Sequence, residues 1–412
     1  MSGHAITTRK SIEPAMANKS TDLKSLEMIR RLIEIPTVSR DSNLALIEHA
    51  QIYLRDLGID SSLFFSEDRR KASLHAVIGP KDRAGVLLVG HTDVVPVDGQ
   101  SWTVDPWKLT EKDGKLFGRG VCDMKGFVAV ALAFAPEFLR RSLKIPIHYG
   151  FTFDEEISRV GITKIVDALG RNGARPAMCI VGEPTEMTVV IAHKGKKSIR
   201  CRVRGFEAHS SLSPHGVNAI EYASELIAYI NRLQHQAAIT GRRDEGFDVP
   251  FTTFNVGVIQ GGTALNILAK DCTFQFEFRH LPQDDPDRLF AQIQSYAKET
   301  LEPRMHKVHA STGFTFEEMS SFPALDTAPD AEVVRLVKTL TRKNEYGKVA
   351  FGTEASIVAV RGGIPSAVCG PGNIDQAHKP DEFATIEQFG LCEEFLFRLA
   401  DHLEGKSTLA PP

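Results

Sequence analysis

The stretch Val86-Leu-Leu-Val-Gly-His-Thr-Asp93 decides the fold of this chain. Four apolar residues in succession are typical of a strand buried on both faces, and such strands occur in parallel sheets covered by helices. The run ends at Gly90, so His91 and Asp93 follow at the carboxyl end of the strand, where open α/β sheets bind ligands. Residues two apart on an extended chain point the same way, so we expect the Asp93 side chain to orient the His91 ring as a metal ligand.

The composition is that of a globular protein with 412 residues, 42% of them hydrophobic, and a formal net charge of −3. This length allows two domains, each with its own core. The charge gives no attraction to nucleic acid or to an anionic membrane, so neither is an expected partner. The six cysteines are isolated from one another, which predicts reduced core residues of a cytoplasmic protein. Residues 1–20 are polar and lack the apolar core of a signal peptide, so we expect a flexible tail.

Helical and strand patterns alternate in the first part of the chain. Helices are predicted at 21–35, 42–57, 128–139 and 160–169, and strands at 62–65, 73–78, 86–89, 145–153 and 178–181. A connection rich in proline and tryptophan, at 96–120, is long enough to be a functional loop. This alternation predicts an α/β domain with a mostly parallel central sheet.

The pattern changes at about residue 195. Alternating strands are predicted at 197–203, 251–259 and 272–278, helices at 218–233 and 285–301, and a last strand near 309–316. This order is that of a split β-α-β unit, an antiparallel sheet with helices on one face. We therefore predict an inserted ferredoxin-like α+β domain at 195–316 within a first domain made of 21–194 and 317–412. The returning part is predicted to hold a helix at 331–342, a short strand at 366–368 and a closing helix at 386–403.

Acidic or imidazole groups follow the strands of the first domain or lie in its loops. They are His91, Asp123, Glu155, Glu156, Glu183 and His378. Buried carboxylates repel one another unless a cation neutralises them, and histidine with carboxylate suits Zn²⁺ or a similar ion. Two cations roughly 3.5–4 Å apart, bridged by one carboxylate, would lower the pKa of a shared water and bind a substrate carbonyl oxygen. Of the neighbours Glu155 and Glu156, one would be a ligand and the other a general base.

Five motifs in this order resemble those of the di-zinc amidohydrolases of the M20 metallopeptidase family. The motifs are Gly-His-Thr-Asp-Val-Val-Pro, Gly-Arg-Gly-x-x-Asp-Met-Lys-Gly, Asp-Glu-Glu, Gly-Glu-Pro-Thr and Ala-His-Lys-Pro-Asp-Glu. The resemblance covers the chain from Leu23 to Leu403, and it implies two Zn²⁺ per subunit, for which Co²⁺ can substitute. It assigns His91 and Glu183 to one zinc, Glu156 and His378 to the other, Asp123 as the bridge, Glu155 as the general base and Asp93 as the partner of His91. It also implies a cis peptide bond between Asp123 and Met124.

The predicted inserted domain resembles the lid and dimerisation domain of the same family. The segment Gly205-Phe-Glu-Ala-His209-Ser-Ser resembles one whose histidine reaches the site of the other subunit. The resemblance therefore implies a homodimer in which His209 stabilises the oxyanion of the reaction. Asn266 and Arg279 resemble the lid residues that hold a substrate carboxylate. Gly352 and Thr353 are predicted to add backbone and hydroxyl contacts to the substrate.

Further motifs are most similar to the acetylornithine deacetylase branch of the family. They are Cys-Asp-Met-Lys-Gly-Phe, Phe-Gly-Thr-Glu-Ala and Gly370-Pro-Gly-Asn-Ile-Asp-Gln-Ala-His378. This likeness implies hydrolysis of the small molecule N²-acetyl-L-ornithine to L-ornithine and acetate, in arginine biosynthesis. Glu183 resembles the glutamate of the deacylases of the family, whereas the aminopeptidase branch usually has aspartate at this position. The close alternatives are a succinyl-diaminopimelate desuccinylase, for which we expect Ser-Gly-Thr at Phe351-Gly-Thr, and another N-acyl-amino-acid deacylase or carboxypeptidase.

Other classes of protein fit the sequence less well. A serine hydrolase is disfavoured because the chain has no Gly-x-Ser-x-Gly motif. A dinucleotide enzyme is disfavoured because Gly118-Arg-Gly and Gly370-Pro-Gly lack the third glycine. A non-catalytic binding member of the fold remains the alternative of another class. The presence of Glu155 beside all five proposed ligands favours an enzyme, since a binding protein has no use for a base beside a metal.

Overall fold

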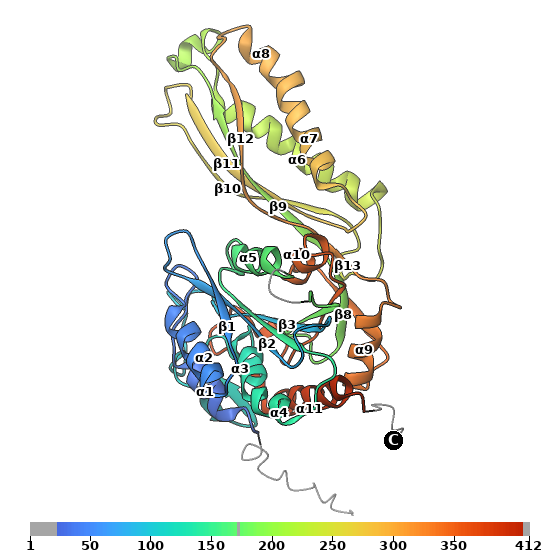
Figure 1. Cartoon of the computed structure of the whole chain (residues 1–412). Coiled ribbons are helices and arrows are strands. Elements are labelled where there is room, and N and C mark those ends of the chain that lie inside the picture. Colours follow the sequence, from blue (N-terminus) through green and yellow to red (C-terminus); the bar gives the residue numbers. More distant parts are fainter. Residues whose placement is uncertain (1–22, 171–173, 407–412) are drawn as a thin grey trace, which may run out of the picture.

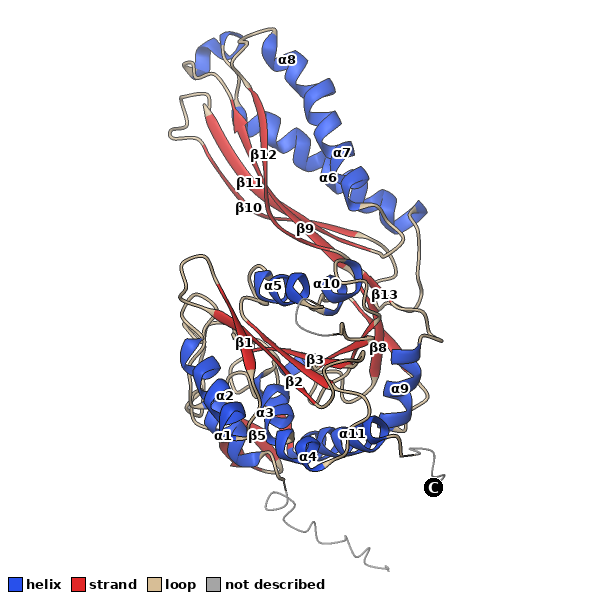
Figure 2. Cartoon of the chain, viewed as in Figure 1, coloured by secondary structure: helices blue, strands red, loops and turns tan. Residues whose placement is uncertain are grey.

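The computed structural model describes residues 23–170 and 174–406, which form two units with separate sheets (Figures 1 and 2). The predicted tail at 1–20 and the helix start at Thr21-Asp22 lie outside the described residues. The larger unit contains both ends of the described chain, and the smaller unit stands beside it as an elongated extension. Among the described residues, no helix is both long enough and apolar enough to cross a lipid bilayer.

The sheet of the larger unit has the strand order β1-β2-β6-β3-β7-β15-β8-β13, with β14 paired to β8. Its strands are β1 (Ser61–Phe65), β2 (Ala72–Ile78), β3 (Val86–His91), β6 (Ile147–Thr152), β7 (Met178–Val181), β8 (Val189–His193), β13 (Leu325–Asp326), β14 (Tyr346–Val349) and β15 (Ser366–Val368). The middle strands β6, β3, β7 and β15 run parallel, while β1, β2 and β13 pair in the antiparallel sense. The expected α/β architecture with a mostly parallel central sheet is confirmed.

Helices cover both faces of this sheet (Figure 2). One face carries α1 (Leu26–Ile33), α2 (Leu44–Asp56), α3 (Lys125–Ala133), α4 (Ala135–Arg140), α9 (Glu332–Thr341) and α11 (Ile386–Glu404), and the other carries α5 (Val160–Ala168) and α10 (Ala355–Val360). Successive residues of β3 belong to opposite cores, because Val86 and Leu88 pack with the first group while Leu87 and Val89 pack with the second. This alternation explains why the strand is apolar without interruption.

The smaller unit is an antiparallel sheet with helices along one face (Figure 2). Its order β10-β11-β9-β12 is built from β9 (Gly195–Arg204), β10 (Thr253–Gly261), β11 (Asp271–His280) and β12 (Gly313–Phe322). The covering helical segments are α6 (Ala219–Thr240), α7 (Pro286–Ser295), the π-helical η3 (Tyr296–Leu301) and α8 (Glu302–His306). Alternate residues of β9 from Ile199 to Val203 and of β11 from Cys272 to Phe278 enter the core beneath these helices. The predicted ferredoxin-like unit is therefore confirmed. Its boundaries stay a proposal, and the end at 316 moves to Phe322, because β12 pairs with β9 up to that residue.

Several elements differ from those predicted. The last strand of the smaller unit lies at Gly313–Phe322 rather than near 309–316, because the chain turns between His309 and Thr312. The predicted helix at 128–139 begins earlier, and Pro136 falls in the first turn of a separate α4. The loop at 96–120 contains a short hairpin. Elements that were not predicted are β4 (Thr110–Lys112), β5 (Lys115–Phe117), β8, β13, β14, β16 (Phe383–Thr385), α8, α10, η2 (Ser210–His215) and η4 (Ile374–Gln376). All six cysteines are buried and free, as predicted.

Candidate active site

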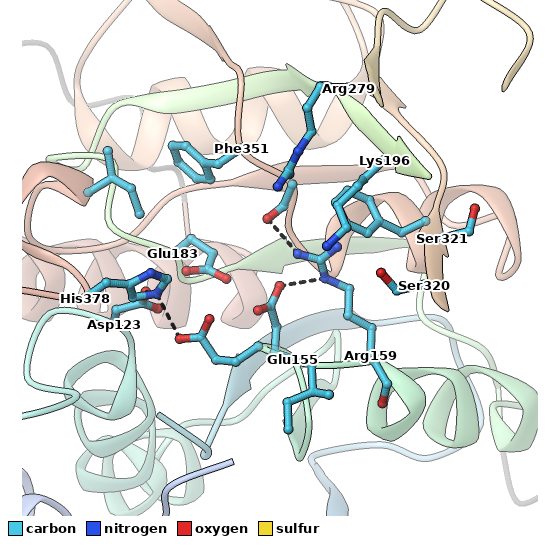
Figure 3. A pocket seen from close by; sticks show the side chains of 16 residues that line it. Asp123, Glu155, Arg159, Glu183, Lys196, Arg279, Ser320, Ser321, Phe351 and His378 are labelled. Carbon is cyan, nitrogen blue, oxygen red and sulfur yellow. Dashed lines mark hydrogen bonds and ion pairs between the residues drawn. The ribbon is translucent and has the colours of Figure 1, made fainter. Parts of the chain in front are cut away.

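The acidic and imidazole residues at the strand ends lie at one edge of the larger sheet. His91 is the last residue of β3, Glu155 and Glu156 follow β6, and Glu183 follows β7. Asp123 precedes α3, and His378 comes from the loop after η4. Apart from His91, which is buried against them, these residues line a single cavity of about 230 Å³ (Figure 3). The smaller unit closes the cavity with Lys196, Arg279 and the segment 320–322.

Two sets of potential metal ligands meet at Asp123. His91, Asp123 and Glu183 form one set, and Asp123, Glu156 and His378 form the other. Within each set the ligand atoms all lie within 4.8 Å of one another. Oδ1 of Asp123 is 2.9 Å from Nε2 of His91, whereas Oδ2 is 3.1 Å from Nε2 of His378. Each oxygen of Asp123 therefore faces a different set, which is the arrangement of a bridging carboxylate.

The charges of these residues are strongly coupled. Burial, together with the neighbouring charge of Asp123, raises the pKa of Glu156 to about 7 and the pKa of Glu183 well above its ordinary value. Burial also opposes ionisation of Asp123, but hydrogen bonds from His378 and His91 outweigh it and hold the Asp123 pKa below its usual range. Hydrogen bonds to Asp123 and Glu156 raise the pKa of His378 to about 10. Such a group of carboxylates requires positive charge, and divalent cations supply it most effectively.

The orientation of the His91 ring fits a cation. Its Nδ1 lies 2.8 Å from the main-chain carbonyl oxygen of Asp93, which is an acceptor only, so Nδ1 carries the hydrogen. In the neutral ring the lone pair of Nε2 then points at Asp123 and at Glu183, whose Oε1 is 3.8 Å away. These groups are stabilised by positive charge between them, which a proton on Nε2 of His91 supplies when no cation is bound and which a divalent cation would replace. The residues present therefore fit a pair of divalent cations, one in each set.

The contacts of Asp93 correct the predicted role of its side chain. Its main-chain carbonyl, and not its carboxylate, bonds Nδ1 of His91; the nearer carboxylate oxygen is 3.8 Å from that nitrogen. The carboxylate instead accepts hydrogen bonds from Ser39 Oγ at 2.6 Å and from the main-chain N–H groups of Glu155 and Glu156 at 3.1 and 3.4 Å. A side chain two residues beyond a strand end can turn toward the neighbouring strand, and here it holds the Glu155-Glu156 turn in place.

Glu382 supports the Asp123 loop, a role that the sequence analysis missed. This fully buried carboxylate accepts main-chain hydrogen bonds from Gly120, Cys122 and Asp123 at 3.0, 2.8 and 3.0 Å. It also pairs with the guanidinium of Arg119 at 2.6 Å. The peptide bond after Asp123 is cis, as predicted. Glu382 is the last residue of the motif Ala-His-Lys-Pro-Asp-Glu. Its position in a motif that also contains His378 could have indicated a role near the site.

Glu155 and Glu156 contact different partners. Oε1 of Glu156 is 3.0 Å from Nε2 of His378. Oε1 of Glu155 instead accepts a hydrogen bond from Nε of Arg159 at 2.7 Å, and Nη2 of Arg159 donates to the carbonyl of Gly352 at 3.0 Å. Glu156 therefore belongs to a ligand set, whereas Glu155 lies beside it. Neither Arg159 nor Lys196 was predicted to belong to the site.

The predicted substrate-contacting residues do not all reach this cavity. Arg279 and Gly352 line it, and Thr353 is buried next to Gly352 with its N–H directed to Nε2 of His193. His209 and Asn266 do not line it within one chain. They are neighbours on the smaller unit, where His209 is exposed and its Nδ1 lies 2.7 Å from Ser211 Oγ, and Asn266 accepts a main-chain hydrogen bond from Ser210.

The comparisons with known proteins agree with this geometry. Residues 87–402 match the model of the peptidase family M20/M25/M40. The chain is 38% identical to an acetylornithine deacetylase from Myxococcus xanthus, over 92% of this chain and 97% of that protein. It is 34% identical to an acetylornithine deacetylase from Pasteurella multocida, over 91% and 96% of the two chains.

Solved structures share the fold at low sequence identity. A tripeptidase from Staphylococcus aureus has a TM-score of 0.73 and 19% identity, with 95% of this chain and 100% of that chain covered. A dinuclear metal-binding peptidase of the M20 family from Bacillus subtilis has a TM-score of 0.63 and 14% identity, with 94% and 99% covered. The likeness therefore extends over both units of the chain.

Proposed function

Because the chain belongs to peptidase family M20/M25/M40, we propose that it is a metal-dependent amide hydrolase that cleaves N²-acetyl-L-ornithine into L-ornithine and acetate. This reaction releases ornithine for arginine biosynthesis. The observation that carries the proposal is the position of Asp123 between two ligand sets in a cavity that also contains Glu155 and Arg279. Curated relatives that cover nearly the whole chain bear the name of this deacetylase.

The two cations are assigned as Zn²⁺, with Co²⁺ as a substitute, because histidine and carboxylate ligands suit these borderline ions. One cation would be held by His91 and Glu183, and the other by Glu156 and His378. Asp123 would bind both cations. Bound there, the cations would act as Lewis acids on the attacking water and on the carbonyl oxygen of the acetyl group. The residues around them have separate tasks, which follow from their contacts.

Glu155 is the proton carrier of the proposed reaction. Its carboxylate lies beside the two ligand sets but belongs to neither, so it can take a proton from the attacking water. The water oxygen forms a bond to the acetyl carbonyl carbon, and the amide carbon–nitrogen bond then breaks. The proton held by Glu155 passes to the leaving nitrogen, which becomes the α-amino group of ornithine. Asp93 holds the main chain of Glu155 during these steps through its hydrogen bond.

The cavity suits a small acylated amino acid. Its volume of about 230 Å³ lies below the range of roughly 300–1,000 Å³ that drug-sized ligands occupy. The carboxylates of the ligand sets face cationic side chains of the smaller unit, Arg279 and Lys196, across this space (Figure 3). An N-acyl amino acid places its amide on the side of the ligand sets and its carboxylate on the cationic side. We assign Arg279 as a carboxylate ligand, with Gly352 and Thr353 as further contacts.

His209 and Asn266 are assigned to the site of a partner subunit. Within one chain they lie outside the cavity, and His209 is exposed on a unit that projects away from the larger one. A homodimer formed through the smaller units would allow His209 to donate to the developing oxyanion, and Asn266 to contact the substrate carboxylate. We place the enzyme in the cytoplasm, with neither nucleic acid nor membrane as a partner.

A substrate panel tests this function. The full chain, loaded with Zn²⁺, is assayed with N²-acetyl-L-ornithine, N-succinyl-LL-diaminopimelate, N-acetyl-L-methionine and a simple dipeptide. We expect the highest kcat/KM for N²-acetyl-L-ornithine. A higher value for the succinylated compound would assign the desuccinylase reaction instead. No turnover of any of the four compounds, with both cations bound, would favour the non-catalytic alternative.

A further inference from the structure

Arg159 connects the proposed proton carrier with the roof of the cavity. It precedes α5 with a left-handed backbone conformation, φ 57°, which is uncommon for a residue other than glycine. Its guanidinium donates to Glu155 at 2.7 Å and to the carbonyl of Gly352 at 3.0 Å. One face of the guanidinium lies 3.6 Å from the ring centre of Phe322. Contacts on two sides and one face fix the orientation of this group.

The fixed guanidinium retains hydrogen-bonding capacity. Arginine has five N–H donors, and within the described residues the hydrogen bonds of Arg159 use only Nε and Nη2. The residue lines the cavity, although it is only 9% exposed, so its remaining donors are largely shielded from bulk water. A charge-assisted hydrogen bond made here is stronger than one on an open surface.

Other cations converge on the same space. Lys196 on β9 pairs with Arg279 on β11 and with Phe322 on β12. The two cations and the aromatic ring therefore form a row across the end of the smaller sheet. Figure 3 shows the guanidinium of Arg159 rising from the larger unit toward Lys196 and Arg279. Arg159 is the member of this cationic group that belongs to the larger unit and touches the proposed proton carrier directly.

The covalent structure of an N-acyl amino acid limits where its carboxylate can bind. The α-carboxylate is attached to the carbon atom that carries the amide nitrogen, so it lies within a few bond lengths of the bond to be cleaved. Its receptor must therefore border the group that delivers the proton to that nitrogen. Arg159 meets this requirement because its Nε is already bonded to Glu155.

We infer that Arg159 is a specificity-determining residue that binds the α-carboxylate of the substrate while it holds Glu155 in place. The inference rests on the proposed function and adds a second arginine to the carboxylate receptor. Since a single planar group contacts both the carboxylate and the proton carrier, recognition of an amino acid is coupled to the alignment of its amide. An amide that lacks the carboxylate binds without this alignment and reacts slowly.

Two amides that differ only in the carboxylate test the inference. N-acetyl-1,4-diaminobutane is N²-acetylornithine without its carboxylate, and both are assayed with Zn²⁺-loaded wild type, Arg159→Met and Arg159→Lys. Because Arg159 also positions Glu155, we expect Arg159→Met to slow the hydrolysis of both amides, but to lower kcat/KM for N²-acetyl-L-ornithine roughly 100-fold more than for the carboxylate-free amide. Arg159→Lys should recover part of the preference for the carboxylate-bearing amide, since lysine keeps the positive charge but lacks the parallel N–H donors of a guanidinium. Arg361→Met is the matched control, because Arg361 is also ion-paired but lies on the surface of the same unit.

Each outcome decides the matter. A selective loss with the carboxylate substrate supports the inference, and equal losses with both amides would overturn it by assigning Arg159 to Glu155 alone. If wild type does not hydrolyse N²-acetyl-L-ornithine, the proposed function fails. The inference is then judged from calorimetric binding of the same two amides to wild type and Arg159→Met, both in the Zn²⁺-loaded form. Weaker binding of the carboxylate compound alone would still support it, and equal binding of both would reject it.

Discussion

The main-chain carbonyl oxygen of Asp93 lies 2.8 Å from Nδ1 of His91, while the carboxylate of the same residue holds the turn at Glu155. One residue thus fixes the imidazole of one ligand set with its backbone and the proposed proton carrier, Glu155, with its side chain. Because the two functions use different atoms, mutation can separate them.

Asp93→Asn should retain the cations but slow the reaction. The backbone contact to His91 survives the substitution, whereas the charge-assisted hydrogen bonds to the main chain of Glu155 and Glu156 weaken. Loss of such bonds corresponds to roughly 1.5–3 kcal/mol, so we expect kcat to fall about 10- to 100-fold. Metal content and kcat are measured on the same preparation, with Ser39→Ala as a milder control. A large loss of metal would show that the carboxylate itself orients His91.

Glu155→Gln should abolish most turnover without releasing the cations. The amide keeps the size of the side chain and can still contact Arg159, but it cannot accept a proton from water. We expect kcat to fall by roughly 10²–10⁴-fold at unchanged metal content. Steady-state assays are combined with elemental analysis of the purified variant. Retention of near wild-type kcat would exclude Glu155 as the proton carrier.

Glu382→Gln should destabilise the fold although Glu382 lies outside both ligand sets. It removes the charge that faces buried Arg119 and weakens the hydrogen bonds to the Asp123 loop. Breaking a buried ion pair costs about 3–5 kcal/mol, which urea unfolding would report as a lower midpoint. Glu225→Gln, which breaks an exposed pair with Arg304, should have little effect. Equal stability of the two variants would contradict the proposed support of the loop.

Stability should fall in acid through two stacked imidazoles, His75 and His148, which belong to neither ligand set. Burial lowers the pKa of His75 to about 4 and that of His148 to about 3. In the unfolded chain both take up protons near pH 6.5, so the unfolded state binds more protons as the pH falls from 6.5 toward 4. The stabilisation is complete above pH 6.5 and declines by at most about 1.4 kcal/mol per pH unit for each histidine.

His148→Asn removes one of these titrating groups and keeps a polar atom near His75. Urea unfolding at pH 7, 6 and 5 should therefore show a shallower decline in the unfolding free energy of the variant than of wild type. Parallel declines would mean that other groups cause the loss of stability in acid.

The sequence predicted the parts of the fold that obey simple periodicity. The apolar run at Val86–Val89 indicated a strand between two helical layers, and its residues do enter two opposite cores. β8 was missed because only Lys194 separates it from β9, so one continuous strand-like pattern passes from the larger sheet into the smaller. Periodicity reports which residues are buried, but it does not report where a chain leaves one sheet for another.

The predicted ligand residues come together because strand order places their strands at one edge. The assignments of cation, base and substrate contact stay proposals. Contacts that depend on tertiary packing could not be read from the sequence. Arg159 meets Gly352 and Phe322 only because the two units close around it, and Glu382 reaches the Asp123 loop from a distant part of the chain. The atom that bonds His91 also depends on a turn whose geometry no residue pattern specifies.

Titration of the metal-stripped chain with Zn²⁺ tests the central claim most directly, with release of ornithine from N²-acetyl-L-ornithine and bound zinc measured in parallel. The account predicts no turnover without metal and a rate that levels off at two zinc ions per chain. It also predicts that Asp123→Ala binds zinc poorly at both sites, because Asp123 belongs to both ligand sets. Full activity after chelation, or an Asp123→Ala variant that still binds two zinc ions tightly, would contradict it.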